Sequence, residues 1–245
     1  MRCIADKGHD PYFNLAAEEY LLKGCSEPIF RLWRNAPSII IGKNQNAAAE
    51  INARFVHEHN IPVVRRLTGG GAVFHDLGNI NFSFIDTRVD GEDTSAMFAR
   101  FTAPIIAALR KLGVEAYLQG RNDLLIDGRK FSGNAFYHSQ GKAYHHGTLL
   151  IHADMDKLTR YLSPSKAKLE AKGVASVRSR VANLREFAPG LSCEDMRNAM
   201  KSAFSEVYGL PLSPLIPDAD FRDAVAAEAE TYGSWQWLYG KQLPF

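Results

Sequence analysis

The chain has 245 residues, of which 46% are hydrophobic and 23% are charged, as expected for one large globular domain or two small ones. A formal net charge of only +2 excludes a protein that binds nucleic acid or another polyanion over its whole surface. The longest apolar runs are far too short to span a bilayer, and residues 1–20 lack the apolar stretch of a signal peptide, so we expect neither a membrane nor a nucleic-acid partner.

The cysteines indicate a reducing compartment. Cys3, Cys25 and Cys193 are far apart and odd in number, so they show neither the spacing of a metal site nor that of a disulfide framework. A cytoplasmic protein is the simplest interpretation.

The first elements are a helix and two strands. Asp10 is a typical N-cap and Pro11 a typical first-turn residue, so they predict a helix that ends at Gly24. Two short β-type runs follow, at residues 29–33 and 38–42.

The next segments alternate between helix and strand. Residues 47–60 carry apolar side chains at helical spacing and lead into a strand at 61–66. Residues 79–85 alternate apolar and polar side chains, which predicts a half-buried strand. Residues 94–112 predict a helix with a kink at Pro104.

A hairpin and a short helix come next. Asp127 and Gly128 lie between two apolar runs, which is the signal of a type I′ turn, and residues 143–151 predict another strand. Asp154 is the expected cap of a short helix that ends near Leu162.

From Ser192 onward the pattern is helical. Ser192 and Asp195 match a capping box, and residues 218–232 predict a second helix. Hairpins together with packed helices favour an α+β fold with a mixed or antiparallel sheet. No linker divides the sequence, so residues 1–245 are expected to form a single domain.

Three consecutive glycines, Gly69, Gly70 and Gly71, follow a strand that ends in Arg65 and Arg66. Backbone N–H groups in such a bend can bind an anion, and guanidinium groups beside them suit phosphate or carboxylate oxygens. A flexible turn beside two solvated arginines is the alternative. The run is neither a Walker loop nor a dinucleotide fingerprint, because no Gly-Lys-Ser/Thr and no helix follow it.

Two further basic features have two interpretations each. Lys130 lies just after the Asp127-Gly128 turn, and a lysine that points inward there needs anionic company, whereas one that points outward needs none. Residues 157–185 contain eight Lys or Arg and one acidic residue, Glu170, and form either a mobile basic loop or a solvated face.

The histidines do not predict a metal cluster. His145 and His146 are adjacent on a strand and therefore point to opposite faces, so they cannot chelate one ion together. We expect no metal site formed by a protein cluster.

The sequence resembles the lipoate–protein ligases over essentially its whole length. The resemblance is carried by several segments in the same order: FNLAAEEY, LWRNAPSIIIGKNQN, RRLTGGGAVFHDLGNINFSF, GRNDLLIDGRKFSGNAF, YHHGTLLIHADMDKLTRYL, KGVASVRSRVANL and SWQWLYGKQLPF. It implies the fold shared with biotin ligases and class II aminoacyl-tRNA synthetases. It also implies that lipoate and ATP form lipoyl-AMP and pyrophosphate, and that an acceptor lysine then takes the lipoyl group.

The resemblance also implies roles for particular residues. Lys130 would be catalytic, touching both the lipoate carboxylate and the α-phosphate. Residues expected to bind ATP or the adenylate are Arg66, Gly71, Ala72, Val73, Phe74, Asp123, Lys130, Ser176, Arg178 and Arg180, with Mg²⁺ carried by ATP and positioned by Asp123. Residues expected to bind lipoate are Trp33, Arg65, Thr68, Gly70, His75, Lys130 and His146.

The implied partners are the lipoyl domains of 2-oxoacid dehydrogenase E2 subunits and the glycine cleavage H protein. Many family members carry a smaller C-terminal domain, which is absent from residues 1–245. Either the chain is naturally short and uses a separate small accessory protein, or it is truncated. In both cases the adenylation step is the one that the missing domain puts in question.

Three alternatives differ in their residue requirements. An ATP-independent octanoyl or lipoyl transferase of the same superfamily needs a nucleophilic cysteine, and all three cysteines lie outside the motif segments. A biotin ligase would need a GRGRxxR loop, which is missing. An RNA-binding relative would use residues 157–185, which lack interleaved aromatic side chains.

Overall fold

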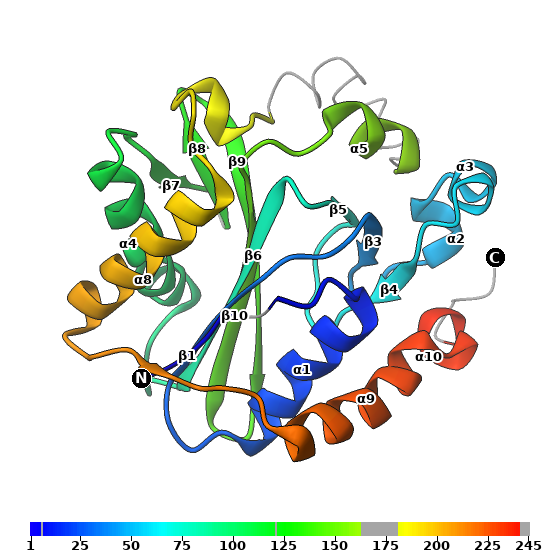
Figure 1. Cartoon of the computed structure of the whole chain (residues 1–245), viewed down its shortest axis with the longest axis horizontal. Coiled ribbons are helices and arrows are strands. Elements are labelled where there is room, and N and C mark those ends of the chain that lie inside the picture. The colour runs from blue at the N-terminus through cyan, green and yellow to red at the C-terminus, as the bar shows by residue number, and fades with distance from the viewer. Residues whose placement is uncertain (6, 121, 163–180, 241–245) are drawn as a thin grey trace.

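The computed structural model describes residues 1–5, 7–120, 122–162 and 181–240. In this part of the chain an eight-stranded sheet has the order β11-β1-β2-β6-β10-β9-β8-β7 (Figure 1). Its strands are β1 (Arg2–Ala5), β2 (Ile29–Trp33), β6 (Asn79–Thr87), β7 (Tyr117–Gln119), β8 (Asp123–Ile126), β9 (Arg129–Ser139), β10 (Lys142–Leu150) and β11 (Ser213–Pro214). β1 runs parallel to β2 and β11, and the other neighbours are antiparallel, so the expected mixed sheet of an α+β fold is confirmed.

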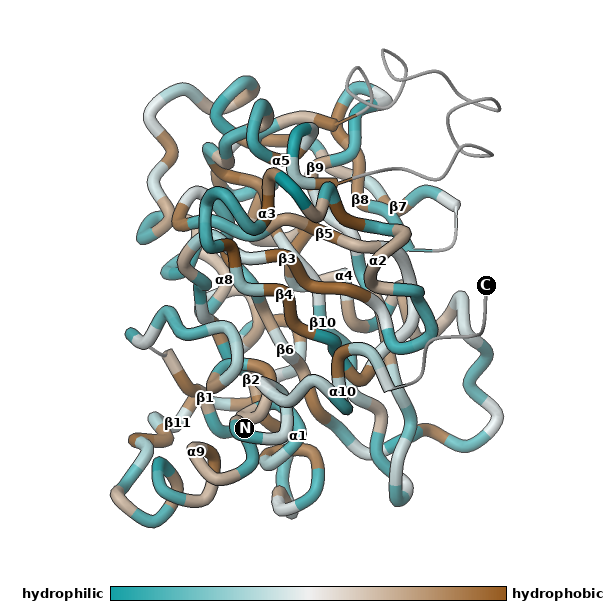
Figure 2. The backbone as a smooth tube through the Cα atoms, turned by 90° about the vertical axis from the view of Figure 1, so that its right-hand side faces the viewer, coloured by the Kyte–Doolittle hydropathy of each residue, from teal (hydrophilic) through white to brown (hydrophobic). Residues whose placement is uncertain are grey.

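A second, smaller sheet lies beside the first and holds the glycine run. It consists of β4 (Val63–Arg65), β3 (Ser38–Ile41) and β5 (Val73–His75), in that order. The backbone tube is brown along much of β3 and β4, which marks hydrophobic residues (Figure 2), and their apolar side chains are buried. The glycine run connects β4 to β5, which flank β3 on opposite sides, so it must cross the end of this sheet.

Helices cover both faces of the large sheet. The described helical segments are α1 (Pro11–Gly24), α2 (Ala47–Glu50), α3 (Ala53–Glu58), α4 (Thr94–Lys111), α5 (Met155–Tyr161), the 3₁₀ turn η1 (Leu184–Glu186), α8 (Cys193–Tyr208), α9 (Ala219–Gly233) and α10 (Trp235–Tyr239). α4 and α8 pack on one face, where Phe82 and Phe84 of β6 join their core. α1 and α9 lie on the other face with Trp33 (Figure 1). None of the described helices is long and apolar enough to cross a membrane.

Local signals placed several boundaries correctly. The Asp10 side chain accepts hydrogen bonds from the Tyr12 and Phe13 N–H groups, and the helix ends at Gly24 as predicted. Asp127 and Gly128 both have positive φ, 48° and 74°, as a type I′ turn requires.

The later helices also follow their signals. Pro104 lies inside α4, Asp154 caps α5, and the capping box of Ser192 and Asp195 begins α8.

Two expectations were wrong. The single helix expected over residues 47–60 is two short helices, because the Asn52 side chain caps the Phe55 N–H and begins a second helix. The strand expected to be half-buried, β6, is buried on both faces: Asn79, Asn81 and Ser83 are at most 1% exposed. On this polar face Ser83 packs under Glu18 of α1 and Asn81 lines a cavity, so these side chains are not exposed to solvent as the alternation predicted.

The adjacent histidines of β10 point to opposite faces, as predicted. His145 stacks on Phe101 with ring centroids 5.1 Å apart and an interplanar angle of 4°. Neither of its ring nitrogens has a hydrogen-bond partner among the described residues. Burial, together with the charges of His146 and Arg100, lowers the pKa of His145 from 6.5 to about 3.

This burial predicts an acid-sensitive fold. The folded-state pKa of His145 lies below its unfolded value, so the stabilisation is complete above pH 6.5 and is lost as the pH falls toward 3. His145→Phe should therefore reduce the pH dependence of the unfolding free energy between about pH 6 and about pH 4 by about 1.4 kcal/mol per pH unit. Urea titrations at several pH values measure this slope. Equal slopes for the two proteins would contradict the prediction.

Candidate active site

Two rows of residues cross the large sheet on the face that carries α1. The strand register aligns one row as Trp33, Asn81, Thr148, Gly133 and Asp123, each on a different strand. Neighbouring strands are about 4.8 Å apart, so this row is roughly 19 Å long. One row therefore joins an apolar end at Trp33 to a charged end at Asp123.

The second row lies two residues away on the same strands. It aligns Arg31, Ser83, His146 and Ala135. Side chains two residues apart on a strand share a face, so both rows lie on the same face of the sheet. From the second row, His146 and Ala135 line the cavity described next.

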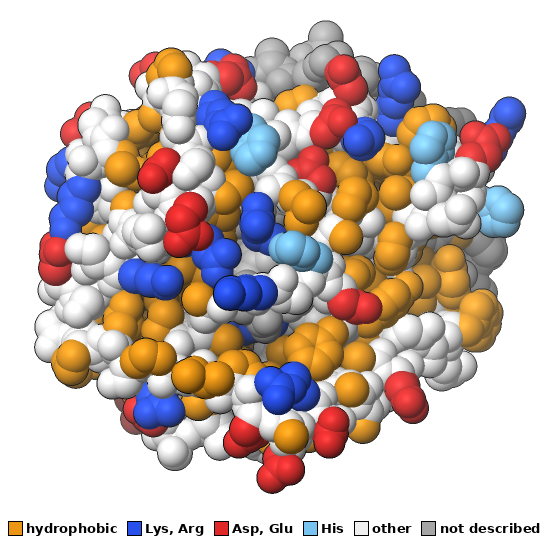
Figure 3. All heavy atoms as spheres, in the orientation of Figure 1, with side chains coloured by type: hydrophobic (Ala, Val, Ile, Leu, Met, Phe, Trp, Pro, Cys, Tyr) orange, Lys and Arg blue, Asp and Glu red, His pale blue; other side chains and the backbone are white. Residues whose placement is uncertain are grey.

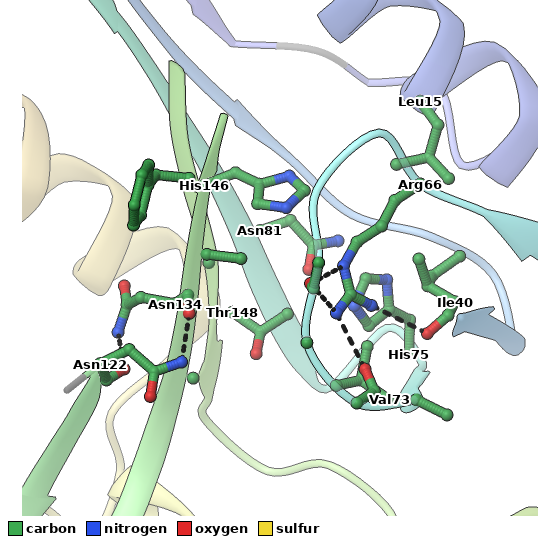
Figure 4. Close-up of a pocket in the computed structure, with 18 of the residues that line it drawn as sticks. Leu15, Ile40, Arg66, Val73, His75, Asn81, Asn122, Asn134, His146 and Thr148 are labelled. Carbon is green, nitrogen blue, oxygen red and sulfur yellow. Dashed lines mark hydrogen bonds between the residues drawn. The ribbon is translucent and has the colours of Figure 1, made fainter. Parts of the chain in front are cut away.

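The cavity has a volume of about 620 Å³ and lies between these rows and the glycine run (Figure 4). In Figure 4, Arg66, His75 and Val73 lie on one side, and Asn122, Asn134 and Thr148 lie on the other. The lining residues are Leu15, Trp33, Ile40, Arg66, Gly69, Gly70, Gly71, Ala72, Val73, His75, Asn81, Thr94, Phe98, Asn122, Lys130, Gly133, Asn134, Ala135, Phe136, His146, Gly147 and Thr148. Lys and Arg side chains and a histidine gather near the centre of the face drawn in Figure 3.

The three glycines of the run differ in what the backbone requires of them. Gly70 has φ +96°, and its carbonyl oxygen would lie 2.1 Å from a Cβ placed on Gly42, so the run passes against the backbone of β3's end. Gly69 and Gly71 have ordinary φ, and a Cβ on either would meet nothing within 4 Å. The missing side chains at these two positions therefore leave backbone exposed to the cavity.

Arg66 holds the run in place. Its guanidinium donates to the carbonyl oxygens of Ile40, Gly69 and Gly71, at 3.1, 2.7 and 2.9 Å. Burial lowers the pKa of Arg66 to about 10, a value at which it stays charged near neutral pH. The side chain was expected to bind nucleotide phosphate; it lines the cavity, but most of its donors contact the loop.

Arg65 points away from the cavity. Its guanidinium Nη1 donates to the carbonyl oxygens of Gly42, Lys43 and Gln45 at 3.0, 3.0 and 2.8 Å, and its other nitrogens donate to Trp237 and Leu238. The structure gives Arg65 a role in joining the small sheet to α10, and it is absent from the cavity lining.

Lys130 forms an ion pair with an acidic side chain. Its Nζ lies 2.7 Å from Asp123 Oδ1 across the β8–β9 hairpin, with both side chains a little over a third exposed. A Cβ on Gly133 would lie 3.1 Å from this Nζ, so the glycine gives the ammonium room above the sheet. The charged end of the cavity is therefore a lysine with one carboxylate partner.

Beside this pair, buried amides form a polar floor. The Asn122 and Asn134 side chains each donate to the other's backbone carbonyl, at 2.6 and 2.9 Å. Asn134 Oδ1, Asn81 Nδ2 and His75 Nε2 have no partner among the residues that the structure describes. Buried polar atoms without partners are costly, and here all three belong to cavity-lining residues, so they are suited to a polar ligand.

The opposite end combines apolar side chains with a buried ionisable network. Glu18 is 2% exposed and lies 3.3 Å from His146 Nδ1, and His146 Nε2 lies 2.7 Å from Thr68 Oγ1. Burial alone would raise the pKa of Glu18, but the charge and hydrogen bond of His146 and a hydrogen bond from Ser83 lower it overall. Burial raises the pKa of Tyr144, so its hydroxyl stays protonated.

The predicted site residues fall into three groups. Those lining the cavity are Trp33, Arg66, Gly70, Gly71, Ala72, Val73, His75, Lys130 and His146. Those near it but outside its lining are Arg65, Thr68, Phe74 and Asp123: Thr68 contacts Arg66 and His146, Phe74 packs on Tyr161, and Asp123 pairs with Lys130. Ser176, Arg178 and Arg180 lie outside the described residues.

Sequence reasoning missed the asparagines and Glu18. Asn81 was taken as the exposed side of a half-buried strand, and Asn122 and Asn134 were inside a motif but had no role. The only available signal was the spacing of Asn14 and Glu18, four residues apart on one helix face.

The cysteines are not placed for thioester chemistry. Cys3, Cys25 and Cys193 are absent from the cavity lining, and burial raises the pKa of each thiol. A nucleophilic cysteine needs a lowered pKa, so the transferase alternative is not favoured. No group of three or more metal-binding side chains occurs in the described part of the chain.

Comparison with known proteins shows the family of the chain. Residues 10–205 match the family model of the lipoyl protein ligase A/B catalytic domain. The chain is 45% identical over 243 residues to lipoate-protein ligase LplJ of Bacillus subtilis (strain 168), covering 97% of this chain and 72% of LplJ.

Two solved structures share the whole fold. A bi-partite lipoate protein ligase from Thermoplasma acidophilum, described with its E2 lipoyl domain, superposes with a TM-score of 0.89 at 29% identity and covers 100% of this chain and 98% of its own. Lipoate-protein ligase A bound with ATP superposes with a TM-score of 0.87 at 28% identity, covering 98% and 99%. The family model, which matches residues 10–205, and the 45% identity to LplJ over 97% of the chain show that the protein belongs to the lipoate–protein ligase family.

Proposed function

We propose that the chain activates lipoate with ATP and transfers the lipoyl group from lipoyl-AMP to a lysine of an acceptor lipoyl domain. The observation that carries this proposal is Lys130, which lines the same cavity as the glycine run and the apolar end at Trp33. An acyl chain at Trp33 would direct its carboxylate along the row of aligned residues toward Lys130.

The chemistry requires a cation where two anions meet. A carboxylate oxygen attacks the α-phosphorus of ATP, a new P–O bond forms, and pyrophosphate leaves. Carboxylate and phosphate repel each other until a positive charge lies between them. The Lys130 ammonium would supply that charge and would orient both groups before they react.

Asp123 is the anionic partner of Lys130. When the two substrate anions replace this contact, the Asp123 carboxylate becomes available to help position Mg²⁺, which prefers oxygen ligands and keeps several waters. We therefore infer that Mg²⁺ arrives with ATP and that Asp123 contributes a carboxylate to its position.

In the second step the acceptor amine attacks the lipoyl carbonyl, the C–O bond to AMP breaks, and the amine loses a proton. We propose lipoyl domains of 2-oxoacid dehydrogenase E2 subunits and the glycine cleavage H protein as acceptors. The solved structure from Thermoplasma acidophilum is described as a bi-partite lipoate protein ligase and its E2 lipoyl domain, which supports this proposal. We further propose that residues 1–245 act as one catalytic domain in the cytoplasm, with a separate accessory protein needed, if at all, for adenylation.

The proposal is tested by a mass-spectrometric acceptor assay. The chain is incubated with a lipoyl domain and either lipoate plus Mg-ATP or synthetic lipoyl-AMP. Modification in both reactions would show a complete ligase, and modification with lipoyl-AMP alone would show a transferase that needs an accessory protein. No modification in either reaction would contradict the proposed function.

Lys130→Ala should abolish lipoyl-AMP formation, because no cation would remain at the meeting point of the two anions. The matched control is Lys111→Ala, which removes a lysine from an exposed ion pair with Glu206 on α4 and α8, far from the cavity lining. Adenylate formation is followed by pyrophosphate release, and circular dichroism checks the fold. Normal turnover by the Lys130 variant would refute its catalytic role.

Gly71→Val should weaken Mg-ATP binding at least about tenfold, or about 1.4 kcal/mol, because a side chain would cover the exposed backbone. The variant should fold normally, since a Cβ at this position meets nothing within 4 Å. Gly24→Val is the matched control: its Cβ position is equally open, but it lies at the end of α1, outside the cavity. Isothermal titration calorimetry measures both affinities, and an unchanged affinity for the Gly71 variant would exclude the nucleotide from this backbone.

A further inference from the structure

Two residues of helix α1, one turn apart, are linked by hydrogen bonds to the two cavity histidines, one directly and one through Asn35. Glu18 contacts His146, and Asn14 reaches His75 through Asn35. The two connections differ in kind. The one to His146 includes the hydroxyls of Tyr144 and Thr68, which can donate or accept, whereas the one to His75 has no hydroxyl and begins at a guanidinium.

The direction of each hydrogen bond from Arg31 through Asn14 and Asn35 to His75 follows from Arg31. A guanidinium has donors only, and Arg31 Nη2 lies 2.6 Å from the Asn14 side-chain oxygen while Nη1 donates to the Asn14 backbone carbonyl at 2.8 Å. The Asn14 oxygen is therefore the acceptor. Its amide nitrogen then donates to the Arg34 carbonyl at 3.1 Å and to Asn35 Oδ1 at 2.9 Å.

The same reasoning fixes the next residue. Because Asn35 Oδ1 accepts from Asn14, the group that faces His75 is the Asn35 amide nitrogen, 3.1 Å from His75 Nδ1. An amide nitrogen donates, so Nδ1 must be the unprotonated nitrogen of the ring. Arg31, Asn14 and Asn35 are fully buried. Solvent therefore does not compete for these hydrogen bonds, and their direction is set by Arg31.

His75 is neutral in this setting. Burial, together with the charges of Arg66 and His146, lowers its pKa to about 3. A neutral imidazole carries one proton, and since Nδ1 accepts, the proton is on Nε2. That atom is buried, belongs to a cavity-lining residue, and has no partner among the residues that the structure describes.

We propose that His75 presents Nε2–H to the bound substrate as a fixed hydrogen-bond donor to an oxygen atom, and that Arg31, Asn14 and Asn35 are positioning residues that set this tautomer. The inference rests on the proposed function, because the substrate supplies the acceptor. It also gives His75 a negative role: with Nδ1 occupied and Nε2 protonated, the ring is not the base that takes the proton of the acceptor amine.

The tautomer is measured on the substrate-free chain, independently of activity. Histidine labelled with ¹⁵N distinguishes protonated from unprotonated ring nitrogens, and His75→Gln identifies the His75 signals by their loss. We expect Nε2 protonated and Nδ1 unprotonated near neutral pH. A protonated Nδ1 in the wild-type chain would overturn the proposal and would leave the proposed function untouched.

Asn35→Asp tests the positioning role. A carboxylate still accepts from Asn14 but can only accept from His75, so Nδ1 should gain a proton whichever charge the ring takes. Asn198→Asp makes the same chemical change on the exposed side of α8 and should leave the His75 signals unchanged. An unprotonated Nδ1 in the Asn35 variant would show that the hydrogen bonds of Arg31, Asn14 and Asn35 do not set the tautomer of His75.

Substitutions of His75 itself separate a donor from a base. The terminal amide of Gln can donate from nearly the position of Nε2, whereas Leu cannot donate. For transfer from lipoyl-AMP we expect kcat/KM of His75→Leu to fall about tenfold below that of His75→Gln, the effect of one buried hydrogen bond. Equal losses in the two variants would exclude the donor role. A wild-type chain inactive with both lipoate plus Mg-ATP and lipoyl-AMP would contradict the proposed function and leave the tautomer result standing.

Discussion

The site depends on how two adjacent buried arginines are satisfied. Arg65 and Arg66 leave the same strand in opposite directions, and a buried guanidinium without acceptors is costly. Arg65 donates to backbone carbonyls of the turn after β3 and of α10. Arg66 donates to backbone carbonyls of β3 and the glycine run and to the Thr68 hydroxyl. Each arginine thereby fixes a segment that has little regular structure of its own. The glycine run can stay free of side chains because Arg66 holds its backbone from behind.

The large sheet solves a different problem, which is to bring distant residues into one line. The strand register places five residues from five strands side by side across the sheet, in the order Trp33, Asn81, Thr148, Gly133 and Asp123. Along the row the side chains change from apolar at Trp33, through the amide of Asn81 and the hydroxyl of Thr148, to the Asp123 carboxylate that pairs with Lys130. The proposed function uses this order, with the acyl chain at the apolar end and its carboxylate directed toward Lys130.

The helix α1 supports this line from below. Its Asn14 and Glu18 are fully buried polar residues, an uncommon arrangement that is stable only when every hydrogen bond is made. Asn14 is held by Arg31, and Glu18 by His146 and Ser83. The two histidines of the cavity are thus oriented by residues that never reach the cavity themselves, which matches the way that ligand-contacting groups are usually held by the residues behind them.

The sequence by itself determined the elements with strong local signals and the family. Asp10 with Pro11, Asp127 with Gly128, and Ser192 with Asp195 each act within a few residues, so their effects can be read without the fold. The motif order likewise identified Lys130 and the glycine run. Only the tertiary structure decided that Asn81 and Ser83 are buried, that Arg65 and Arg66 point to different places, and that Asn14 reaches His75. Alternation along a strand shows that two faces differ, but not what covers them, and the direction of a hydrogen bond follows from which partner the fold places opposite it.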